Sequence, residues 1–195
     1  MRNRCFLGVF VCLGFFLTGQ LGASLPSGSR AWAQSPRSTG VNFKLVPNLE
    51  PMKEVGPTPD FTLPTPAGKK ISLKNFRGKI VFLNFWASWC APCREEMPAM
   101  ERLYREFKDK GLAVLAVNVK DSRKKAVDFV TELKLSYPIV LDTDGQVGVL
   151  YGAWGLPTTY LIGRNGDGLA RLWGPAPWYS PGARELMRTL LEAKG

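Results

Sequence analysis

The sequence predicts a mixed α/β domain in which helices cover a central sheet. Residues 80–85 and 112–119 are near-continuous apolar runs of β-forming residues, which is typical of buried strands. A stretch with helical spacing of apolar residues follows each run, so strand and helix alternate. Nearer the C-terminus, Asn165-Gly166 separates two β-rich segments and predicts an antiparallel hairpin. A parallel strand pair joined to a hairpin gives a mixed central sheet flanked by helices.

The other elements follow from spacing and turn residues. Phe61 and Leu63 alternate with polar residues ahead of Ala67-Gly68, which predicts a hairpin with residues 70–73. A helix is expected to begin around residues 90–92, because proline suits the first helical turn. The sequence further predicts a helix over 124–135, a strand over 139–141, a helical turn over 147–151, strands over 159–162 and 169–173, and a closing helix over 183–193.

The N-terminus has the pattern of a targeting segment. Arg2 and Arg4 precede an apolar run, and Ala31-Trp32-Ala33 offers a small-x-small cleavage sequence. The uncharged stretch over residues 5–29 is also long enough to span a bilayer. Residues 1–33 are therefore expected to be either a cleaved signal peptide or a retained membrane anchor. Both alternatives, together with the positive-inside rule, place the rest of the chain outside the cytoplasm.

A tether is expected between the targeting segment and the domain. Eight of the 15 prolines fall between positions 26 and 66, and serines accompany them. Such a composition indicates an extended linker with little core of its own. We therefore expect a Pro/Ser-rich tether over residues 34–56 and a folded domain over 57–195, with regular structure beginning near Pro59.

Charge and composition exclude several kinds of site. The chain has 26 Lys and Arg against 16 Asp and Glu, a net charge of +10, and it has no histidine. Ser-His-Asp and Cys-His catalysis and histidine-ligated metal sites are therefore excluded. The positive charge is scattered, and its longest cluster, Arg123-Lys124-Lys125, is expected on a solvated helix face. We expect no nucleic-acid partner.

The domain carries one cysteine pair, Cys90 and Cys93, because Cys5 and Cys12 lie in the targeting segment. A disulfide scaffold would use more cysteines, and a zinc site would need further ligands. A C-x-x-C between a buried strand and a helix instead suits redox chemistry, since the helix N-terminus favours a thiolate at Cys90. We expect Cys90 to be exposed and to attack first, and a shielded Cys93 to resolve the mixed disulfide. Pro92 would rigidify this turn.

Several motifs carry a family resemblance. The run Phe85-Trp86-Ala87-Ser88-Trp89-Cys90-Ala91-Pro92-Cys93 resembles the active site of thioredoxin-fold proteins. Pro59-Asp60-Phe61-Thr62-Leu63, Gly78-Lys79 and Gly155-Leu156-Pro157-Thr158-Thr159-Tyr160 are similar to the TlpA/ResA/CcmG branch of extracytoplasmic thiol-disulfide oxidoreductases. The resemblance covers roughly residues 56–195. It implies a thioredoxin-like fold with an N-terminal β-hairpin extension and an αβ insertion.

The resemblance also implies roles for single residues. Pro157, after Leu156, matches the family's cis-proline, which lies against the C-x-x-C. Glu96 matches an acidic residue that handles protons in ResA-like proteins, and apolar neighbours would raise its pKa. The alternative for Glu96 is a solvated helix residue like its neighbour Glu95. Asn84 stands where thioredoxin has a buried aspartate, which removes the usual proton acceptor.

The remaining candidates line the expected site. Trp86 and Trp89 are expected to form its walls and pack against it rather than take part in the chemistry. Ala91 and Pro92 are expected to tune the cysteine pair as the intervening dipeptide. No metal or separate cofactor is expected, because the Cys90–Cys93 disulfide itself would carry the electrons.

By this resemblance the chain is expected to reduce disulfides in exported proteins such as apocytochrome c. Electrons would come from a membrane thiol-transfer protein of the CcdA/DsbD type, because exported space is oxidising. Three alternatives stay open. The first is a disulfide oxidase or isomerase, although strongly oxidising relatives often place histidine between the cysteines. The second is a thiol peroxidase, which would have threonine where Ala87 stands. The third is a copper- or haem-assembly binding module.

Overall fold

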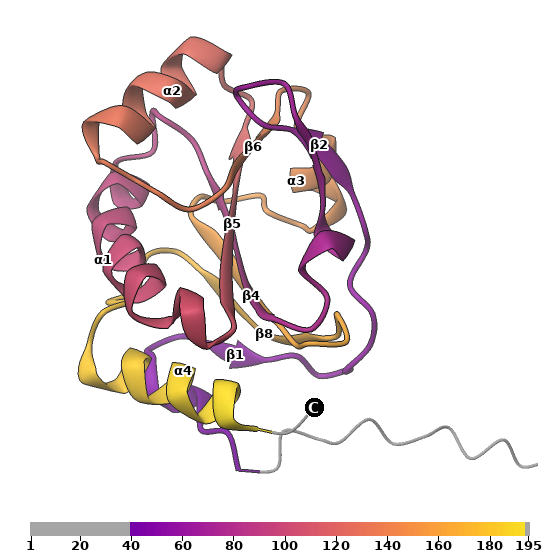
Figure 1. Cartoon of the computed structure of the whole chain (residues 1–195), viewed down its shortest axis with the longest axis vertical. Coiled ribbons are helices and arrows are strands. Elements are labelled where there is room, and N and C mark those ends of the chain that lie inside the picture. Colours follow the sequence, from indigo (N-terminus) through magenta and orange to yellow (C-terminus); the bar gives the residue numbers. More distant parts are fainter. Residues whose placement is uncertain (1–39, 194–195) are drawn as a thin grey trace, which may run out of the picture. The chain divides into compact units, whose positions relative to one another are not determined.

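The computed structural model describes residues 40–193, drawn in colour in Figure 1. The expectations for the targeting segment and the first part of the tether fall outside the described residues. The six-stranded main sheet has the order β1-β8-β7-β4-β5-β6. Its strands are β1 (Glu50–Pro51), β4 (Ile80–Trp86), β5 (Leu112–Val119), β6 (Ile139–Asp142), β7 (Thr158–Ile162) and β8 (Gly168–Trp173).

The predicted mixed sheet is confirmed. Strand β4 pairs in parallel with β5, and β5 pairs in parallel with β6. On the other side of β4, strands β7, β8 and β1 follow in antiparallel pairing. Every residue of β4 and β5 is buried, which explains their near-continuous apolar sequences. The C-terminal end of β4, from which a short loop leads to the C-x-x-C, therefore lies between two neighbouring strands.

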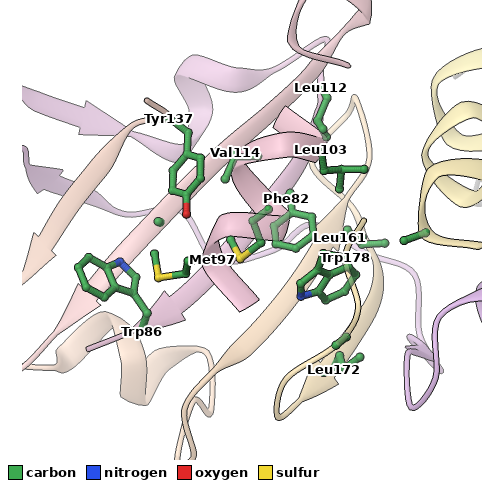
Figure 2. Packing of buried hydrophobic residues seen from close by; sticks show 14 of the residues in the cluster. Phe82, Trp86, Met97, Leu103, Leu112, Val114, Tyr137, Leu161, Leu172 and Trp178 are labelled. Carbon is green, nitrogen blue, oxygen red and sulfur yellow. The ribbon is translucent and has the colours of Figure 1, made fainter. Parts of the chain in front are cut away.

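Side chains of β4 alternate between two cores on opposite faces of the sheet. Phe82 and Trp86 face the core formed with α1 (Ala91–Phe107), α2 (Arg123–Glu132) and α4 (Pro181–Glu192). Figure 2 shows Phe82 in this core near Trp178, with the two ring centroids 4.6 Å apart. The hairpin of β2 (Thr62–Pro64) and β3 (Lys70–Ser72) and the short α3 (Gln146–Leu150) lie on the opposite face (Figure 1).

The predicted order of elements is confirmed, and the bounds differ by a few residues. The helix predicted over 124–135 runs from Arg123 to Glu132. It ends early because Lys134 has a φ of 53°, which a continuing helix cannot accommodate. Within residues 40–193, no helix combines the length and hydropathy required to cross a bilayer.

The expectation that regular structure begins near Pro59 is wrong. Residues 41–51, which we call the N-terminal strap, contain a 3₁₀ turn over Phe43–Leu45 and strand β1. The spacing of Phe43, Val46 and Leu49 places all three side chains in the core beside α4. A Cβ at Gly182 would lie 2.3 Å from the carbonyl oxygen of Leu45, so the glycine permits this close approach. The burial of these apolar side chains therefore holds the strap against the core despite its linker-like composition. Strand β1 also pairs with β8 and so covers the edge of that strand.

The strap predicts a stability difference between two valines. Val46 is 1% exposed, whereas Val55 is 48% exposed. We expect Val46→Ala to lower the free energy of unfolding by about 2 kcal/mol, because it removes buried methyl groups and leaves a cavity. Val55→Ala is the matched control and should change it by less than about 0.5 kcal/mol. Urea denaturation measures both, and equal effects would mean that the strap adds nothing to the core.

Candidate active site

The two cysteines lie at the junction of β4 and α1. After β4 ends at Trp86, the backbone turns, and the Cys90 N–H donates to the Ala87 carbonyl at 3.1 Å. Cys90 is the N-cap residue of α1, and its sulfur accepts a hydrogen bond from the Cys93 backbone N–H at 3.2 Å. The two sulfurs form a disulfide, with the Cα atoms 5.3 Å apart. The first turn of α1 thus directs an N–H group and the positive end of the helix dipole at Cys90.

The expected exposure of Cys90 is wrong for this oxidised form. Cys90 is 4% exposed and Cys93 is fully buried. The physical reason is that the Cys90 sulfur turns inward to bond Cys93 and to accept its N–H. Ala91 and Pro92 instead form the exposed surface over the disulfide. Of the predicted wall residues, Trp86 is fully buried and Trp89 is 66% exposed.

Glu96 is buried one helical turn beyond Cys93, and the solvated alternative is wrong. Glu96 is 4% exposed, and its carboxyl group accepts three hydrogen bonds. Asn84 Nδ2 donates to Oε1 at 3.1 Å, while the Ala176 backbone N–H and Trp178 Nε1 donate to Oε2 at 3.1 and 3.0 Å. Figure 2 shows Trp178 in the core beside the sheet, from where its indole N–H reaches the carboxyl group.

Burial raises the pKa of Glu96 from its ordinary value of 4.5 to about 7. The hydrogen bonds from Ala176, Trp178 and Asn84 act in the opposite direction, because they stabilise the charged form. The carboxyl group therefore exchanges its proton near neutral pH. Since residues three apart on a helix share a face, it is placed to accept a proton from the Cys93 side.

Asn84 of β4 connects Glu96 on α1 with the neighbouring strand β7. Its Nδ2 donates both to Glu96 and to Thr159 Oγ1 of β7, the latter at 3.0 Å. Its Oδ1 is buried and accepts no hydrogen bond within the described residues. A half-turn of the amide would present Oδ1 to Glu96, which could then donate its proton when neutral. An amide can serve both protonation states of Glu96, whereas a second carboxylate would repel the charged one.

A second buried acid fixes the loop before Cys90. Asp121 Oδ2 accepts the backbone N–H of Ser88 at 2.6 Å and the side-chain amide of Asn118 at 3.2 Å. Asp121 is 7% exposed and follows the end of β5. The adjacent parallel strand therefore holds the loop that carries Trp89 and Cys90.

The Leu156–Pro157 peptide bond is cis, as the resemblance implies. Strand β7 begins at Thr158, which pairs with Phe85 of β4. Because the two strands are antiparallel, the same register places Pro157 opposite Trp86. Pro157 is buried and Leu156 is half-buried. The register thus places the cis-proline at the same end of the sheet as the cysteines.

Sequence reasoning missed four contributors to this site: Ala176, Trp178, Thr159 and Asp121. Ala176 and Trp178 lie 80 and 82 positions from Glu96. No local spacing links such distant residues, and only the run Trp178-Tyr179-Ser180-Pro181 before α4 offered a signal. Within residues 40–193, no three Cys, Asp or Glu side chains cluster closely enough to hold a metal ion. That the disulfide works without a cofactor stays a prediction.

Comparison with known proteins agrees with this geometry. The model of the AhpC/TSA family matches residues 56–167. The chain belongs to the AhpC/TSA family. Within this family it is 39% identical over 173 residues to the thiol-disulfide oxidoreductase ResA of Bacillus cereus, and the match covers 89% of this chain and 90% of the relative.

Solved structures support the same assignment. A Chlorobium tepidum protein, provisionally named thiol:disulfide interchange protein DsbE, aligns with a TM-score of 0.65 and 35% identity. It covers 71% of this AhpC/TSA-family chain and 98% of its own. A secreted thiol-disulfide isomerase from Corynebacterium glutamicum aligns with a TM-score of 0.63 and 27% identity, covering 74% of this chain and 90% of its own. With its C-x-x-C at disulfide distance, the chain is a ResA-like thiol-disulfide oxidoreductase with a thioredoxin-like fold.

The buried carboxyl predicts how the stability of this oxidoreductase depends on pH. Because the pKa of Glu96 is about 7 in the folded chain and 4.5 ordinarily, the folded state holds the proton more tightly. The stabilisation is complete below about pH 4.5, and about 3 kcal/mol of it is lost as the pH rises through 7. Glu96→Gln cannot ionise and should remove this dependence.

Glu95→Gln is the matched control, because Glu95 is the exposed neighbour on the same helix. Urea denaturation of the oxidised chain at pH 5 and pH 8 measures the difference. The wild type and Glu95→Gln should lose the same stability between these two pH values, and Glu96→Gln should lose about 3 kcal/mol less. An unchanged slope for Glu96→Gln would mean that Glu96 does not titrate in this range.

Proposed function

We propose that this oxidoreductase reduces disulfides in exported proteins outside the cytoplasm. The observation that carries the proposal is the buried carboxyl of Glu96, one turn beyond Cys93. Strong disulfide-forming proteins are oxidising because their reduced form is stabilised. Glu96, which becomes negative near pH 7, destabilises the reduced form instead, because its charge disfavours a negatively charged thiolate nearby. Neutral Ala91-Pro92 between the cysteines adds no positive charge.

The chemistry runs through one mixed disulfide. The Cys90 thiolate attacks one sulfur of the substrate disulfide, and the other substrate sulfur leaves as a thiolate that takes a proton from water. The Cys93 thiol then gives its proton to Glu96 and attacks the Cys90 sulfur. The second substrate sulfur leaves and is protonated. Two electrons have moved from the dithiol to the substrate, and the Cys90–Cys93 disulfide is formed.

Turnover requires a donor of two electrons, because exported space does not regenerate dithiols. A membrane thiol-transfer protein of the CcdA/DsbD type would supply them by the same exchange in reverse. The N-terminal targeting pattern and the secreted relative from Corynebacterium glutamicum support an extracytoplasmic location. Retention of residues 1–33 as an anchor would keep the domain close to that donor.

Oxidised apocytochrome c is the substrate that the ResA resemblance favours, and its reduction would serve cytochrome c maturation. Other exported proteins with a disulfide between nearby cysteines are chemically equivalent substrates. The alternative function is oxidation or isomerisation of disulfides, and the secreted isomerase among the structural relatives favours keeping it as the second candidate. The two functions differ in the reduction potential of the cysteine pair.

The reduction potential therefore tests the direction of electron flow. We expect the Cys90–Cys93 pair to have a potential near that of thioredoxin, about −270 mV. Equilibration of the chain in thiol buffers, followed by tryptophan fluorescence, measures it, because Trp89 adjoins Cys90. A potential near −120 mV, roughly that of a strong oxidant, would make this a disulfide-forming protein.

The roles of the two cysteines predict which variant traps a partner. Cys93→Ser should accumulate a mixed disulfide through Cys90, because the resolving thiol is missing. Cys90→Ser is the matched control and should trap little, since Cys93 is fully buried. Non-reducing electrophoresis and mass spectrometry after exposure to an oxidised peptide measure the adduct. A reversed pattern would show that the attacking and resolving roles are exchanged.

A further inference from the structure

Three buried polar atoms of the core under α1 have no hydrogen-bond partner within residues 40–193. They are the indole Nε1 of Trp86, the amide Oδ1 of Asn118 and the hydroxyl oxygen of Tyr137. The three residues are 0%, 1% and 3% exposed. Buried polar atoms are nearly always paired, because an unpaired one destabilises the folded chain. Neither the fold nor the proton chemistry described above uses these atoms.

Strand register brings the three residues to one face of the sheet. Trp86, the last residue of β4, pairs with Asn118 of β5 in the parallel ladder. Paired residues of neighbouring strands point to the same face, and Trp86 lies in the core covered by α1. Tyr137 belongs to that core and lies two residues before Ile139, which pairs with Ala116. Ala116 precedes Asn118 on this face and, with only a methyl group, leaves room beside it.

Neighbouring rings fix the directions of the two aromatic side chains. The Trp86 ring centroid lies 4.6 Å from that of Phe129 on α2, and the Tyr137 ring stands perpendicular to Tyr104 of α1 at 5.9 Å. Figure 2 shows the Tyr137 hydroxyl and the Trp86 indole nitrogen pointing toward the same region beside Met97. Both polar groups are therefore directed into one part of the core.

Asp121 determines which way the Asn118 amide faces. Asn118 Nδ2 donates to Asp121 Oδ2 at 3.2 Å, and the same oxygen accepts the Ser88 N–H. A carboxylate accepts hydrogen bonds and donates none, so the amide nitrogen faces Asp121 and Oδ1 faces away from it. The three atoms thus comprise one donor on Trp86, one acceptor on Asn118 and one hydroxyl that serves as either.

We propose that Trp86, Asn118 and Tyr137 bind an internal water molecule, and that this water hydrogen-bonds the Cys93 sulfur once the disulfide is reduced. Water accepts the indole N–H, donates to the amide oxygen and pairs with the hydroxyl. Three such bonds are usual for a buried water. A metal cation cannot accept the indole N–H, and an anion without a proton cannot donate to the amide oxygen. Water is therefore the ligand that suits this set of atoms.

The fourth hydrogen-bonding position of the water is left for Cys93. Cys93 is fully buried in the same core and lies four residues before Met97, so the two share a face of α1. The reduced sulfur is either a thiol, which donates, or a thiolate, which accepts. Because the Tyr137 hydroxyl can reverse the sense of its own bond, the water serves both states. A disulfide sulfur carries neither a proton nor a charge, so the water stabilises the reduced form more.

Trp86, Asn118 and Tyr137 are thus positioning residues, since they act on Cys93 through the water. The water site goes beyond the proposed function and does not depend on the direction of electron flow. A hydrogen bond to reduced Cys93 forms whether the chain reduces disulfides or makes them. The two proposals can therefore fail separately.

A crystal structure of the oxidised full-length chain tests whether water occupies the site. We expect one water about 2.7–3.2 Å from Trp86 Nε1, Asn118 Oδ1 and Tyr137 Oη. A dry core at this place would overturn the inference. So would side chains that bond one another directly and leave no room for the water.

Tyr137→Phe tests the site in solution, because it removes the hydroxyl and keeps the ring. With water bound, the variant of the oxidised chain should unfold at a lower urea concentration, since the water loses one partner. An unpaired hydroxyl in a dry core would give the opposite sign, and an equal or higher midpoint would contradict the water site. Tyr104→Phe is the matched control, as the same substitution in the adjacent ring, and should keep the wild-type midpoint.

The reduction potential tests the hydrogen bond to Cys93. Tyr137→Phe should favour the oxidised form about fivefold in glutathione buffers, which corresponds to a potential about 20 mV more negative. Tyr104→Phe should keep the wild-type potential. An unchanged potential in Tyr137→Phe would overturn the inference even if the variant were less stable. The proposed reductase is refuted instead by the absolute potential of the wild type, which leaves the difference between the two variants unaffected.

Discussion

The carboxyl group of Glu96 is the constraint on which the arrangement of this site depends. A buried carboxyl group requires hydrogen-bond donors, and here they come from the central strand and from the segment before the last helix. Satisfying it fixes α1 against β4 and fixes residues 176–178 against α1. Because Cys93 lies one turn away on the same helix, the same interactions determine how deeply the disulfide is buried. Packing and proton chemistry are therefore determined by one group.

The electrostatics of the site follow from the balance of two opposing effects. The N-terminus of α1 stabilises negative charge on Cys90, and the Cys93 N–H points at its sulfur. Burial raises the pKa of Glu96, so this nearby acid is partly neutral at physiological pH. The helix N-terminus thus favours negative charge at Cys90, whereas a full negative charge at Glu96 develops only as protons are removed. In the proposed mechanism, this division gives attack to Cys90 and proton-coupled resolution to Cys93.

Local patterns predicted most of the fold, because the spacing of apolar residues along a strand or helix indicates which of its faces is buried. The buried β4 and β5, the hairpin at Asn165-Gly166 and the closing helix are examples. The strap was missed because its two prolines continue the proline-rich composition of a linker, while the three apolar side chains that it buries are too few to stand out. They become core residues only because α4 and β8 offer them a surface.

The sequence by itself determined the redox pair and the order of the elements, since each depends on neighbouring residues: the C-x-x-C and the apolar periodicities. The candidate acid, Glu96, followed from the resemblance to the TlpA/ResA/CcmG branch. Only the tertiary structure decided that Glu96 is buried and that Trp178 and Ala176 donate to it. The physical reason is that the pKa of a buried group depends on which distant segments come together around it. Strand pairing and helix packing create those contacts.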